Sequence, residues 1–564
     1  MTDTLAITLA QINPTVGDVV GNVEHVRQAR REAAAQGADL VVCGELATAG
    51  YPPEDLVLMG AFQEHLEERV LGLAAETADG GPGVLVGAPW RRGGALYNGA
   101  LLLDGGAISA AAFKVELPNY GVFDERRIFT AGPQPAPIIF RGVALGVMVC
   151  EDMWYPETTR HLKEDGARIL IVINGSPFEL DKNGTRQDLA RARIGESGLP
   201  LAYVNLIGGQ DELVFDGASF VLGADGGPLV QAGLWEPQVV LTQWRRNGDD
   251  WACDAAPVGE LHLAPVAEEI ENVYRALVMG LGDYVTKNGF PGVLIGLSGG
   301  IDSALTAAIA VDALGPERVR CVMMPSPYTS MVSLEDAAAV ARLLGAELEC
   351  IEIGPSMKAF EEMLKPAFAG QDADVTEENI QARVRGVTLM ALSNKFGSMV
   401  VSTGNKSELS VGYATLYGDM CGGFSVLKDV YKTMVFALAR WRNAARPPGG
   451  LGPEGPVMPE RVITKAPSAE LKHDQTDQDF LPPYEELDAI VHGLIEGGLS
   501  AGEISAEGHD PALVERVWGM VDRAEYKRRQ APPGVKIGHR AFGRDRRYPI
   551  TNAFETHYRP KSQT

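Results

Sequence analysis

The sequence predicts an α/β protein built from two domains. Its 564 residues exceed what one hydrophobic core ordinarily organises, so two or more domains are expected. In both halves of the chain, short runs of β-branched and aliphatic residues alternate with segments of helical periodicity, which is typical of strands and helices packed in layers. The hydrophobic share of 45% and the charged share of 22% are those of a globular protein.

The first half contains the clearest strand pattern. Apolar runs predict strands at 5–12, 40–46, 83–89, 143–152, 167–176 and 199–209, and helical periodicity predicts helices at 22–38 and 184–198. Residues 222–262 are rich in turn-forming and polar residues, which indicates the end of a domain. We therefore expect a first domain at 1–245, a linker at 246–265 and a second domain at 266–564.

The second half begins with a predicted helix at 266–289 and a strand at 293–297. Further strand and helix patterns follow at 318–330, 334–346 and 398–408. The stretches 445–460 and 465–484 have the composition of loops, and loops of this length in a compact domain are usually functional or mobile.

Charge and cysteine content exclude several classes of protein. The net charge of −24 argues against a nucleic-acid or anionic-membrane partner, because attraction to phosphate needs a basic surface. No apolar run reaches the roughly 18–20 residues of a membrane helix, and the N-terminal segment lacks the basic region of a signal peptide. The six cysteines form no CxxC pair, so neither a zinc site nor a disulfide framework is expected. We expect a reducing, cytoplasmic location.

The segment IGLSGGIDSALTAA at 295–308 has the composition of a phosphate-binding loop. Glycines let backbone N–H groups turn toward an anion, and the following helix presents its positive dipole end. Ser298 and Ser303 add hydroxyl donors, and Asp302 would hold Mg2+ against the phosphates. The segment is neither G-x-x-x-x-G-K-[ST] nor G-x-G-x-x-G. The alternative is a plain glycine turn that caps a helix, but strand, glycines, aspartate and serines all coincide here.

SGGIDS resembles the loop of the ATP pyrophosphatases, which cleave ATP between the α- and β-phosphates and adenylate a carboxylate or carbonyl oxygen that an amine then attacks. The loop alone does not separate the members of that class. Residues 376–423 and 465–488 resemble the core of the NAD synthetases in particular. This resemblance implies a Rossmann-like domain with a parallel sheet, ATP as substrate and Mg2+. The segment DQTDQDFLPPY at 474–484 is either a surface loop or a lid, and the need to shield an acyl-adenylate from water favours the lid.

The resemblance also implies binding residues. ATP would contact Gly296, Leu297, Ser298, Gly299, Gly300, Ile301, Asp302, Ser303 and Thr403. The dinucleotide substrate, deamido-NAD, would contact Asn379, Glu408, Tyr413, Ala414, Thr415, Leu416 and Lys527. Asp302 and Glu408 would bind the metal. Lys536 lies in the same basic tail and is the alternative to Lys527.

Cys150 stands in LGVMVCEDMWYP, directly after a predicted buried strand. A lone cysteine at a strand end is ordinarily an inert core thiol, and no histidine lies near the strand-end motifs to support a thiol protease. Glu45 and Lys114 also follow apolar or strand-like runs, so the three residues meet at one sheet edge if their strands are neighbours. A carboxylate can take the thiol proton, and an ammonium group can stabilise the thiolate and the oxyanion.

The order Glu45, Lys114, Cys150 and the segments GYPPEDL, LPNYGVFDE, CEDMW and NGSPF resemble the nitrilase-like amidases, in particular the glutaminase domain fused to NAD synthetases. This resemblance implies an α-β-β-α sandwich. It makes Glu45 the general base, Lys114 the group that stabilises the thiolate and the oxyanion, and Cys150 the nucleophile.

By the same resemblance, Tyr120, Ser176 and Lys182 would bind L-glutamine. Glu125 is either a second carboxylate that orients the site or a surface carboxylate. Asp181 departs from the glycine that the family usually has before Lys182, which leaves the shape of the glutamine pocket open.

Together, these resemblances predict that glutamine-derived ammonia amidates deamido-NAD, with AMP, pyrophosphate and glutamate as by-products. The family further implies an internal route for ammonia and a homo-oligomer. One alternative is a similar glutaminase that feeds another adenylating amidotransferase. Another is a binding or scaffold protein that retains both folds, although all the expected catalytic side chains are present.

Overall fold

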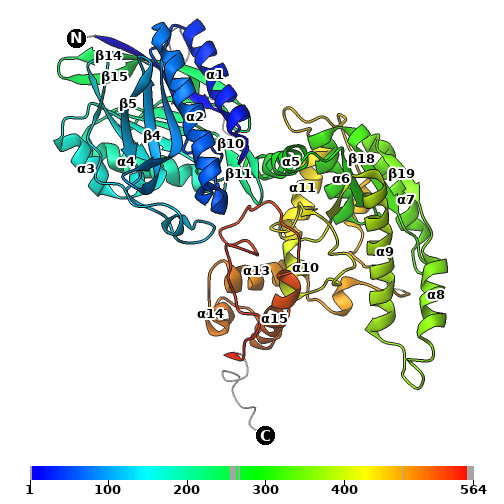
Figure 1. Ribbon diagram of the computed structural model, residues 1–564. Helices are drawn as coiled ribbons and strands as arrows, with labels where there is room; N and C mark the ends of the chain where they lie inside the picture. Colours follow the sequence, from blue (N-terminus) through cyan, green and yellow to red (C-terminus); the bar gives the residue numbers. More distant parts are fainter. Residues whose placement is uncertain (1–2, 255–261, 264–266, 474, 555–564) are drawn as a thin grey trace. The chain divides into compact units, whose positions relative to one another are not determined.

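The chain forms two units, Met1–Ala267 and Glu268–Thr564. The computed structural model describes residues 3–254, 262–263, 267–473 and 475–554. Each unit combines sheets with covering helices (Figure 1). In the described part of the chain, no helix has the length and apolar composition of a membrane span.

The first unit contains two seven-stranded sheets. The first sheet has the order β15-β14-β1-β2-β3-β4-β5 and consists of β1 Thr4–Gln11, β2 Leu40–Cys43, β3 Gly83–Arg92, β4 Ala95–Asp104, β5 Ala107–Phe113, β14 Gln238–Asn247 and β15 Asp250–Asp254. The second has the order β16-β13-β12-β9-β8-β7-β6 and consists of β6 Ile138–Phe140, β7 Val143–Val149, β8 Ile169–Asn174, β9 Leu201–Asn205, β12 Phe220–Leu222, β13 Pro228–Gln231 and β16 His262–Leu263. A separate hairpin joins β10 Ile207–Gln210 to β11 Leu213–Asp216.

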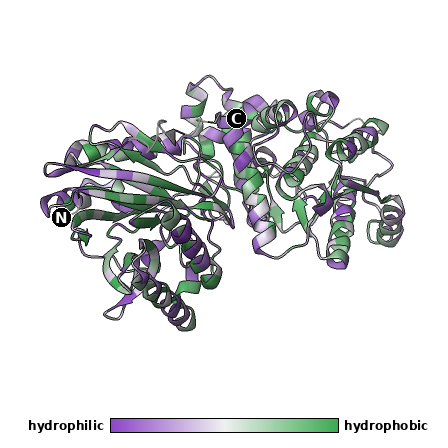
Figure 2. Ribbon diagram, turned by 90° about the horizontal axis from the view of Figure 1, so that it is seen from above, coloured by the Kyte–Doolittle hydropathy of each residue, from purple (hydrophilic) through white to green (hydrophobic). Residues whose placement is uncertain are grey.

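The two sheets face each other across a buried core that includes Ile7 of β1 and Val147 of β7. Helices α1 (Val19–Ala35) and α2 (Gly60–Glu76) cover the outer face of the first sheet, and α3 (Pro156–Glu164) and α4 (Lys182–Ser197) cover the second. Because both faces of the central strands are buried, those strands are almost continuously hydrophobic (Figure 2). The unit is the expected α-β-β-α sandwich.

The stretch at 222–262, expected to be turn-rich, contains the strands β13, β14 and β15. Residues 238–245 of β14 pair antiparallel with the whole of β1. The prediction was wrong because β14 and β15 bury only alternate residues, such as Trp244 and Trp251, and expose polar ones between them. The expected linker at 246–265 thus overlaps β15, and residues 255–261 and 264–265 of it lie outside the described residues.

The second unit is built on a parallel five-stranded sheet. Its order is β19-β18-β17-β20-β21, with β17 Val293–Gly296, β18 Val319–Met323, β19 Glu347–Cys350, β20 Met399–Ser402 and β21 Phe424–Ser425. The order of strands along the chain reverses between β17 and β20. In open parallel sheets, ligands bind at such a switch point, beyond the carboxyl ends of the strands. The topology therefore selects the loops after β17 and β20 as the binding region.

Most helices of the second unit surround this sheet. They are α5 Glu269–Lys287, α6 Ile301–Leu314, α7 Met331–Leu344, α8 Gly354–Leu364, α9 Val375–Phe396, α11 Lys432–Ala444 and α12 Glu460–Thr464. A second core, which includes Leu487 and Val517, joins α10 Lys406–Val411, α13 Tyr484–Ile495, α14 Ala501–Ala506, α15 Pro511–Arg523 and α16 Glu525–Arg528. Apart from α12 and a short 3-10 turn at Asp477–Asp479, the described residues of the two predicted loops are irregular; Asp474 lies outside them.

Candidate active sites

The first candidate site is assembled from both sheets of the first unit. Glu45 follows β2 and Lys114 follows β5 in the first sheet, whereas Cys150 follows β7 in the second. The expectation that three neighbouring strands bring these residues to one sheet edge is wrong, because β2 and β5 are separated by β3 and β4. The residues meet because the ends of two facing sheets lie together.

A lysine between two carboxylates forms the centre of this site. Lys114 Nζ donates to Glu45 Oε1 at 2.7 Å and to Glu125 Oε1 at 2.8 Å, and all three side chains are buried. Burial by itself lowers the pKa of Lys114, but Glu125 and Glu45 outweigh it and hold this pKa well above its ordinary value. Glu125 also accepts from Tyr51 Oη at 2.8 Å. The surface alternative for Glu125 is therefore wrong.

Glu45 is held at both carboxylate oxygens. In addition to Lys114, Asn98 Nδ2 donates to Oε1 at 2.7 Å, and the backbone N–H of Gly175 donates to Oε2 at 2.9 Å. A Cβ at residue 175 would lie 3.2 Å from Oε2 and 3.1 Å from the Tyr51 ring, so a larger residue would crowd both groups. These contacts fix the orientation of the carboxylate.

Cys150 lies at a sharp change of chain direction. It begins the 3-10 helix Cys150–Trp154 with φ of 48°, a left-handed conformation that is rare outside glycine and concentrates at functional sites. Burial, and to a smaller extent the charge of Glu45, raises the pKa of Cys150 well above its ordinary value, and Lys114 opposes this shift. The resting residue is therefore a thiol that needs a base before it can attack.

Asp152 ties the two sheet ends together. Its Oδ1 accepts from the N–H groups of Val115 and Glu116 at 2.9 and 2.8 Å, directly after Lys114, and its Oδ2 accepts from Val149 at 3.0 Å. Burial raises the pKa of Asp152 to about 7, although these N–H groups lower it. Sequence reasoning missed this residue, although the motif CEDMW contains it.

The three predicted glutamine-binding residues surround this centre. Tyr120 Oη donates to Glu151 at 3.0 Å, and the Tyr120 ring meets the Phe123 ring edge-on at 5.6 Å. Lys182 Nζ lies 5.9 Å from the centre of the same Phe123 ring and 3.2 Å from Glu179. Tyr120 and Lys182 thus flank one aromatic side chain.

Ser176 is fixed through its N–H, carbonyl and hydroxyl groups by Asn205 and Arg186. Asp181 has φ of 61°, which explains why a glycine suits this position. Asp is among the residues that tolerate the left-handed region, so the departure from the family pattern preserves the turn before Lys182.

A small pocket adjoins the lysine centre. It is lined by Tyr51, Pro52, Pro53, Glu54, Val122, Phe123, Asp124, Glu125, Ile128, Phe129 and Leu213. Its walls are mostly apolar, and its polar members include the carboxylate that contacts Lys114.

The second candidate site lies at the switch point of the parallel sheet. Gly296 ends β17, Leu297 follows it, and Ile301 begins α6. Gly299 has φ of 81°, and a Cβ there would lie 2.3 Å from the Ser333 carbonyl oxygen, so the turn requires glycine. Ser298 Oγ and Ser303 Oγ lie 3.0 Å apart across the turn and hold it closed. These contacts give the loop a fixed shape at the amino end of a helix, where anions bind.

A second lysine between two carboxylates stands beside this loop. Lys432 Nζ donates to Asp302 Oδ2 at 2.5 Å and to Glu408 Oε1 at 3.0 Å. Asn405, which with Thr403 follows β20, donates to the other oxygen of Asp302 at 2.8 Å. Sequence reasoning missed Lys432, because a lysine at the start of a helix is ordinarily solvated.

The convergence of these two carboxylates on one ammonium group tests the fit to Mg2+. Oxygen ligands of Asp302 and Glu408 that reach a common cation are the ligands Mg2+ prefers. In the described part of the chain, no three His, Cys, Asp or Glu side chains form a metal site by themselves. The residues present therefore fit Mg2+ bound through two carboxylates, with phosphate and water oxygens completing the shell.

The predicted deamido-NAD residues gather around α10. Thr415 Oγ1 donates to Asn379 Oδ1 at 3.0 Å, and Tyr413, Ala414 and Leu416 pack against the helical core. A small pocket beside them is lined by Ser402, Gly404, Glu408, Leu409, Ala414, Asp419, Met420, Ser425, Ala531 and Pro532.

The two tail lysines differ in their contacts. Lys527 Nζ donates to the carbonyl oxygens of Gly412 and Ala414, both at 2.7 Å, and so lies against the predicted substrate segment. Lys536 is buried and pairs with Asp545 at 3.0 Å. The contacts favour Lys527 as the lysine near the substrate.

Part of the predicted loop at 465–484 contacts the same region. Tyr484 Oη, at the start of α13, donates to Asp477 at 2.6 Å and to Glu408 at 3.5 Å. Glu470 accepts from the hydroxyls of Ser330 and Ser333, both at 2.8 Å, at the start of α7. The loop is therefore attached at two points close to the phosphate loop.

Both halves match known families. Residues 6–248 match the family described as carbon-nitrogen hydrolase, and residues 273–531 match NAD synthase. The fold and the two sites thus define a protein that joins a carbon-nitrogen hydrolase to a nucleotide-dependent synthase.

Similar proteins of known name narrow this class. The glutamine-dependent NAD(+) synthetase of Rhodobacter capsulatus is 49% identical, over 98% of this chain and 99% of its own, and that of Thermotoga maritima is 44% identical over 98% and 99%. The structure of glutamine-dependent NAD+ synthetase from Acinetobacter baumannii, in complex with ADP, matches with a TM-score of 0.76 and 43% identity over 97% of this chain and 98% of that one. This chain belongs to the glutamine-dependent NAD(+) synthetases.

Proposed function

We propose that the protein makes NAD by ATP-dependent amidation of deamido-NAD, with ammonia released from L-glutamine. The observation that carries the proposal is the buried Glu45–Lys114 pair beside Cys150, in a chain whose other unit has an SGGIDS loop at the switch point of a parallel sheet. The first unit supplies the nitrogen, and the second activates the carboxylate that receives it.

In the first unit, Cys150 Sγ attacks the carboxamide carbon of glutamine while Glu45 takes the thiol proton. Lys114 stabilises the developing oxyanion. The C–N bond then breaks, the proton passes to the leaving nitrogen, and ammonia departs from a γ-glutamyl thioester. Water attacks the thioester as Glu45 takes a proton from it, which releases glutamate and restores the thiol.

Tyr120, Ser176 and Lys182 bind the glutamine. The Lys182 ammonium suits the α-carboxylate of the substrate, and the carboxylate of Glu151 beside Tyr120 suits its α-ammonium group. Glu151, bonded to Tyr120, and Lys182, near the Phe123 ring, would supply these opposite charges.

In the second unit, an oxygen of the nicotinate carboxylate attacks the α-phosphorus of ATP, and pyrophosphate leaves. Ammonia then attacks the acyl-adenylate carbon, and AMP leaves as NAD forms. The N–H groups of residues 298–300 and the hydroxyls of Ser298 and Ser303 hold the phosphates, with Thr403 at the neighbouring strand end. Asn379, Tyr413, Thr415 and Lys527 hold the dinucleotide.

Asp302 and Glu408 would hold Mg2+, which supplies charge neutralisation to the pyrophosphate when bound. Lys432 holds the same two carboxylates in place. The segment at 474–484 acts as a lid, which the contacts of Tyr484 with Asp477 and Glu408 support.

The proposal includes a cytoplasmic location and a homo-oligomer. All six cysteines are free, which suits a reducing compartment. Apolar side chains such as Val387 and Phe396 of α9 are exposed, which supports burial against another copy. Light scattering of the purified protein checks the oligomer.

The deciding experiment incubates the purified protein with ATP, Mg2+ and deamido-NAD and compares glutamine with ammonium as nitrogen donor. With either donor, one AMP should form for each NAD, and with glutamine one glutamate should form as well. Amidation of a different carboxylate, with deamido-NAD inert, would favour another adenylating amidotransferase instead. Failure to release AMP with either donor would favour a binding protein.

A further inference from the structure

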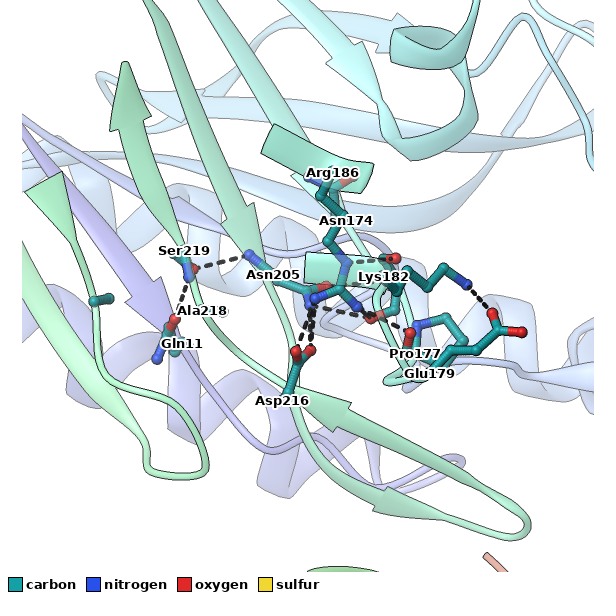
Figure 3. Close-up of polar contacts among 12 residues, drawn as sticks. Gln11, Asn174, Pro177, Glu179, Lys182, Arg186, Asn205, Asp216, Ala218 and Ser219 are labelled. Atoms are coloured by element: carbon teal, nitrogen blue, oxygen red, sulfur yellow. Dashed lines mark hydrogen bonds and ion pairs between the residues drawn. The ribbon is translucent and has the colours of Figure 1, made fainter. Parts of the chain in front are cut away.

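A buried arginine, Arg186, holds the segment that contains Ser176, one of the proposed glutamine-binding residues. Arg186, on α4, and Asp216, on β11, are each only 2% exposed at the side chain, and Arg186 Nη1 donates to both carboxylate oxygens of Asp216 at 2.8 and 2.9 Å. Figure 3 shows these side chains and Asn205 pointing toward one another. This ion pair uses Nη1 alone. The N–H groups of Nε and Nη2 are therefore available for other partners.

Those remaining N–H groups all serve one short segment. Arg186 Nη2 donates to the carbonyl oxygens of Ser176 and Pro177 at 2.8 and 2.9 Å, and Nε donates to Ser176 Oγ at 3.1 Å. Asn205 completes the arrangement, since its amide accepts from Ser176 N at 2.9 Å and donates to Ser176 O at 3.0 Å. The position of Ser176 is thereby determined by two buried side chains.

The same segment also reaches the general base. Gly175, next to Ser176, donates its N–H to Glu45 Oε2 at 2.9 Å, while Lys114 and Asn98 occupy Oε1. A shift of the segment would therefore move Ser176 in the glutamine pocket and also release one oxygen of Glu45. The guanidinium group of Arg186, by holding this segment, therefore affects both the position of Ser176 and the orientation of Glu45.

Lysine cannot replace this guanidinium. Arginine presents several N–H donors in a fixed planar fork, whereas lysine has one nitrogen on a flexible chain. A lysine at this position can reach Asp216 or the carbonyl oxygens of the segment, but it cannot hold both in the observed geometry.

We propose that Arg186 is a positioning residue of the glutaminase reaction, which holds residues 175–177 so that Ser176 meets glutamine and Gly175 orients Glu45. This inference rests on the proposed function of the first unit. It assigns Arg186 no contact with the substrate.

The test compares Arg186→Lys with the unchanged protein in the full chain. We expect the KM for glutamine to rise and kcat for glutamine hydrolysis to fall, each by about 10- to 100-fold, because small misplacements at a site have effects of this size. NAD synthesis with ammonium should stay within about twofold, since it depends on the other unit.

Arg30→Lys is the matched control. Arg30 is also a buried arginine that binds a carboxylate, Asp79, and a backbone carbonyl oxygen, that of Pro82, at 2.8 Å, but it contacts no residue of the site. Its glutamine kinetics should be unchanged. A double-mutant cycle of Arg186→Lys with Ser176→Ala should show non-additive effects on KM if Arg186 acts through Ser176.

Unchanged glutamine kinetics in Arg186→Lys would overturn the proposal, as would strictly additive effects of the two substitutions on KM in the cycle. If Arg186→Lys also loses ammonium-dependent synthesis, Asp216→Asn decides by the same assays. If Asp216→Asn raises the KM for glutamine and keeps ammonium-dependent NAD synthesis, the positioning role is supported. If its KM for glutamine is unchanged, or if it loses both glutamine hydrolysis and ammonium-dependent synthesis, the proposal is overturned. Failure of the unchanged protein to amidate deamido-NAD would contradict the proposed function separately, because glutamine hydrolysis is measured by itself.

Discussion

The two sites share one arrangement in different surroundings. In the first unit, Lys114 joins Glu45 and Glu125, whose side chains are 0% and 6% exposed. In the second, Lys432 joins Asp302 and Glu408, whose side chains are each 19% exposed. The lysine is buried in both, so the difference lies in how far water reaches the carboxylates.

This difference matches the proposed chemistry of each site. A proton transfer between Cys150 and Glu45 benefits from a closed site, where electrostatic interactions are strong and the geometry is fixed. A site that takes up Mg2+ and charged phosphates must let carboxylates exchange one cation for another, which requires access from solvent. The same three-residue cluster therefore serves different steps according to its burial.

The largest effect is expected from Cys150→Ala, which should disable the first site and leave the second active. Cys150→Ala should reduce glutamine-dependent NAD synthesis by about a thousandfold or more, because it removes the nucleophile. Synthesis with ammonium should remain, since the second unit is intact. NAD formation measured with each donor checks this, and loss of both activities together would argue against two separate sites.

The converse change is Asp302→Asn, which keeps the side-chain volume. We expect NAD synthesis with either donor to fall by about a hundredfold or more, because the phosphate site loses a charged ligand. Hydrolysis of glutamine by the first unit should continue. Glutamate release and NAD formation are measured in parallel, and full NAD synthesis would count against Asp302 as a metal ligand.

Replacing Lys114 or Lys432 by methionine tests whether the burial of the two clusters differs in its effect on stability. Lys114→Met leaves Glu45 and Glu125 buried without a cation, which costs about 3–5 kcal/mol for a fully buried pair. Lys432→Met should destabilise its unit less, because water reaches Asp302 and Glu408. Calorimetric unfolding of both variants checks the order, and equal destabilisation would show that burial does not distinguish the sites.

The smallest expected effect is in the pH dependence of the reactivity of the Cys150 thiol. Since burial raises the pKa of Cys150 well above its ordinary value, the fraction of thiolate keeps increasing as pH rises past about 8.5. Labelling of Cys150 by iodoacetamide should therefore accelerate through that range without levelling off. The Cys150→Ala variant supplies the background from the other five cysteines, and a plateau near neutral pH would indicate a stabilised thiolate instead.

The sequence by itself predicted many of the strands and helices, and it shows which residue types follow some of those strands. Continuous apolar runs predicted β1, β8 and β17, because burial on both faces removes polar residues from a strand. The segment SGGIDS predicted its own turn, because glycines and a helix start are local features. Strands with one exposed face, β14 and β15, escaped prediction.

Only the tertiary structure decided which side chains meet. Lys432 contacts Asp302 across 130 residues of chain, and Asp152 binds the N–H groups that follow Lys114 in the opposite sheet. Glu125 became a buried partner of Lys114, and Arg186 a support for Ser176, through packing that no local pattern records. Periodicity and turn composition reflect burial and local geometry along the chain, whereas these contacts depend on how sheets face each other and on the order of their strands.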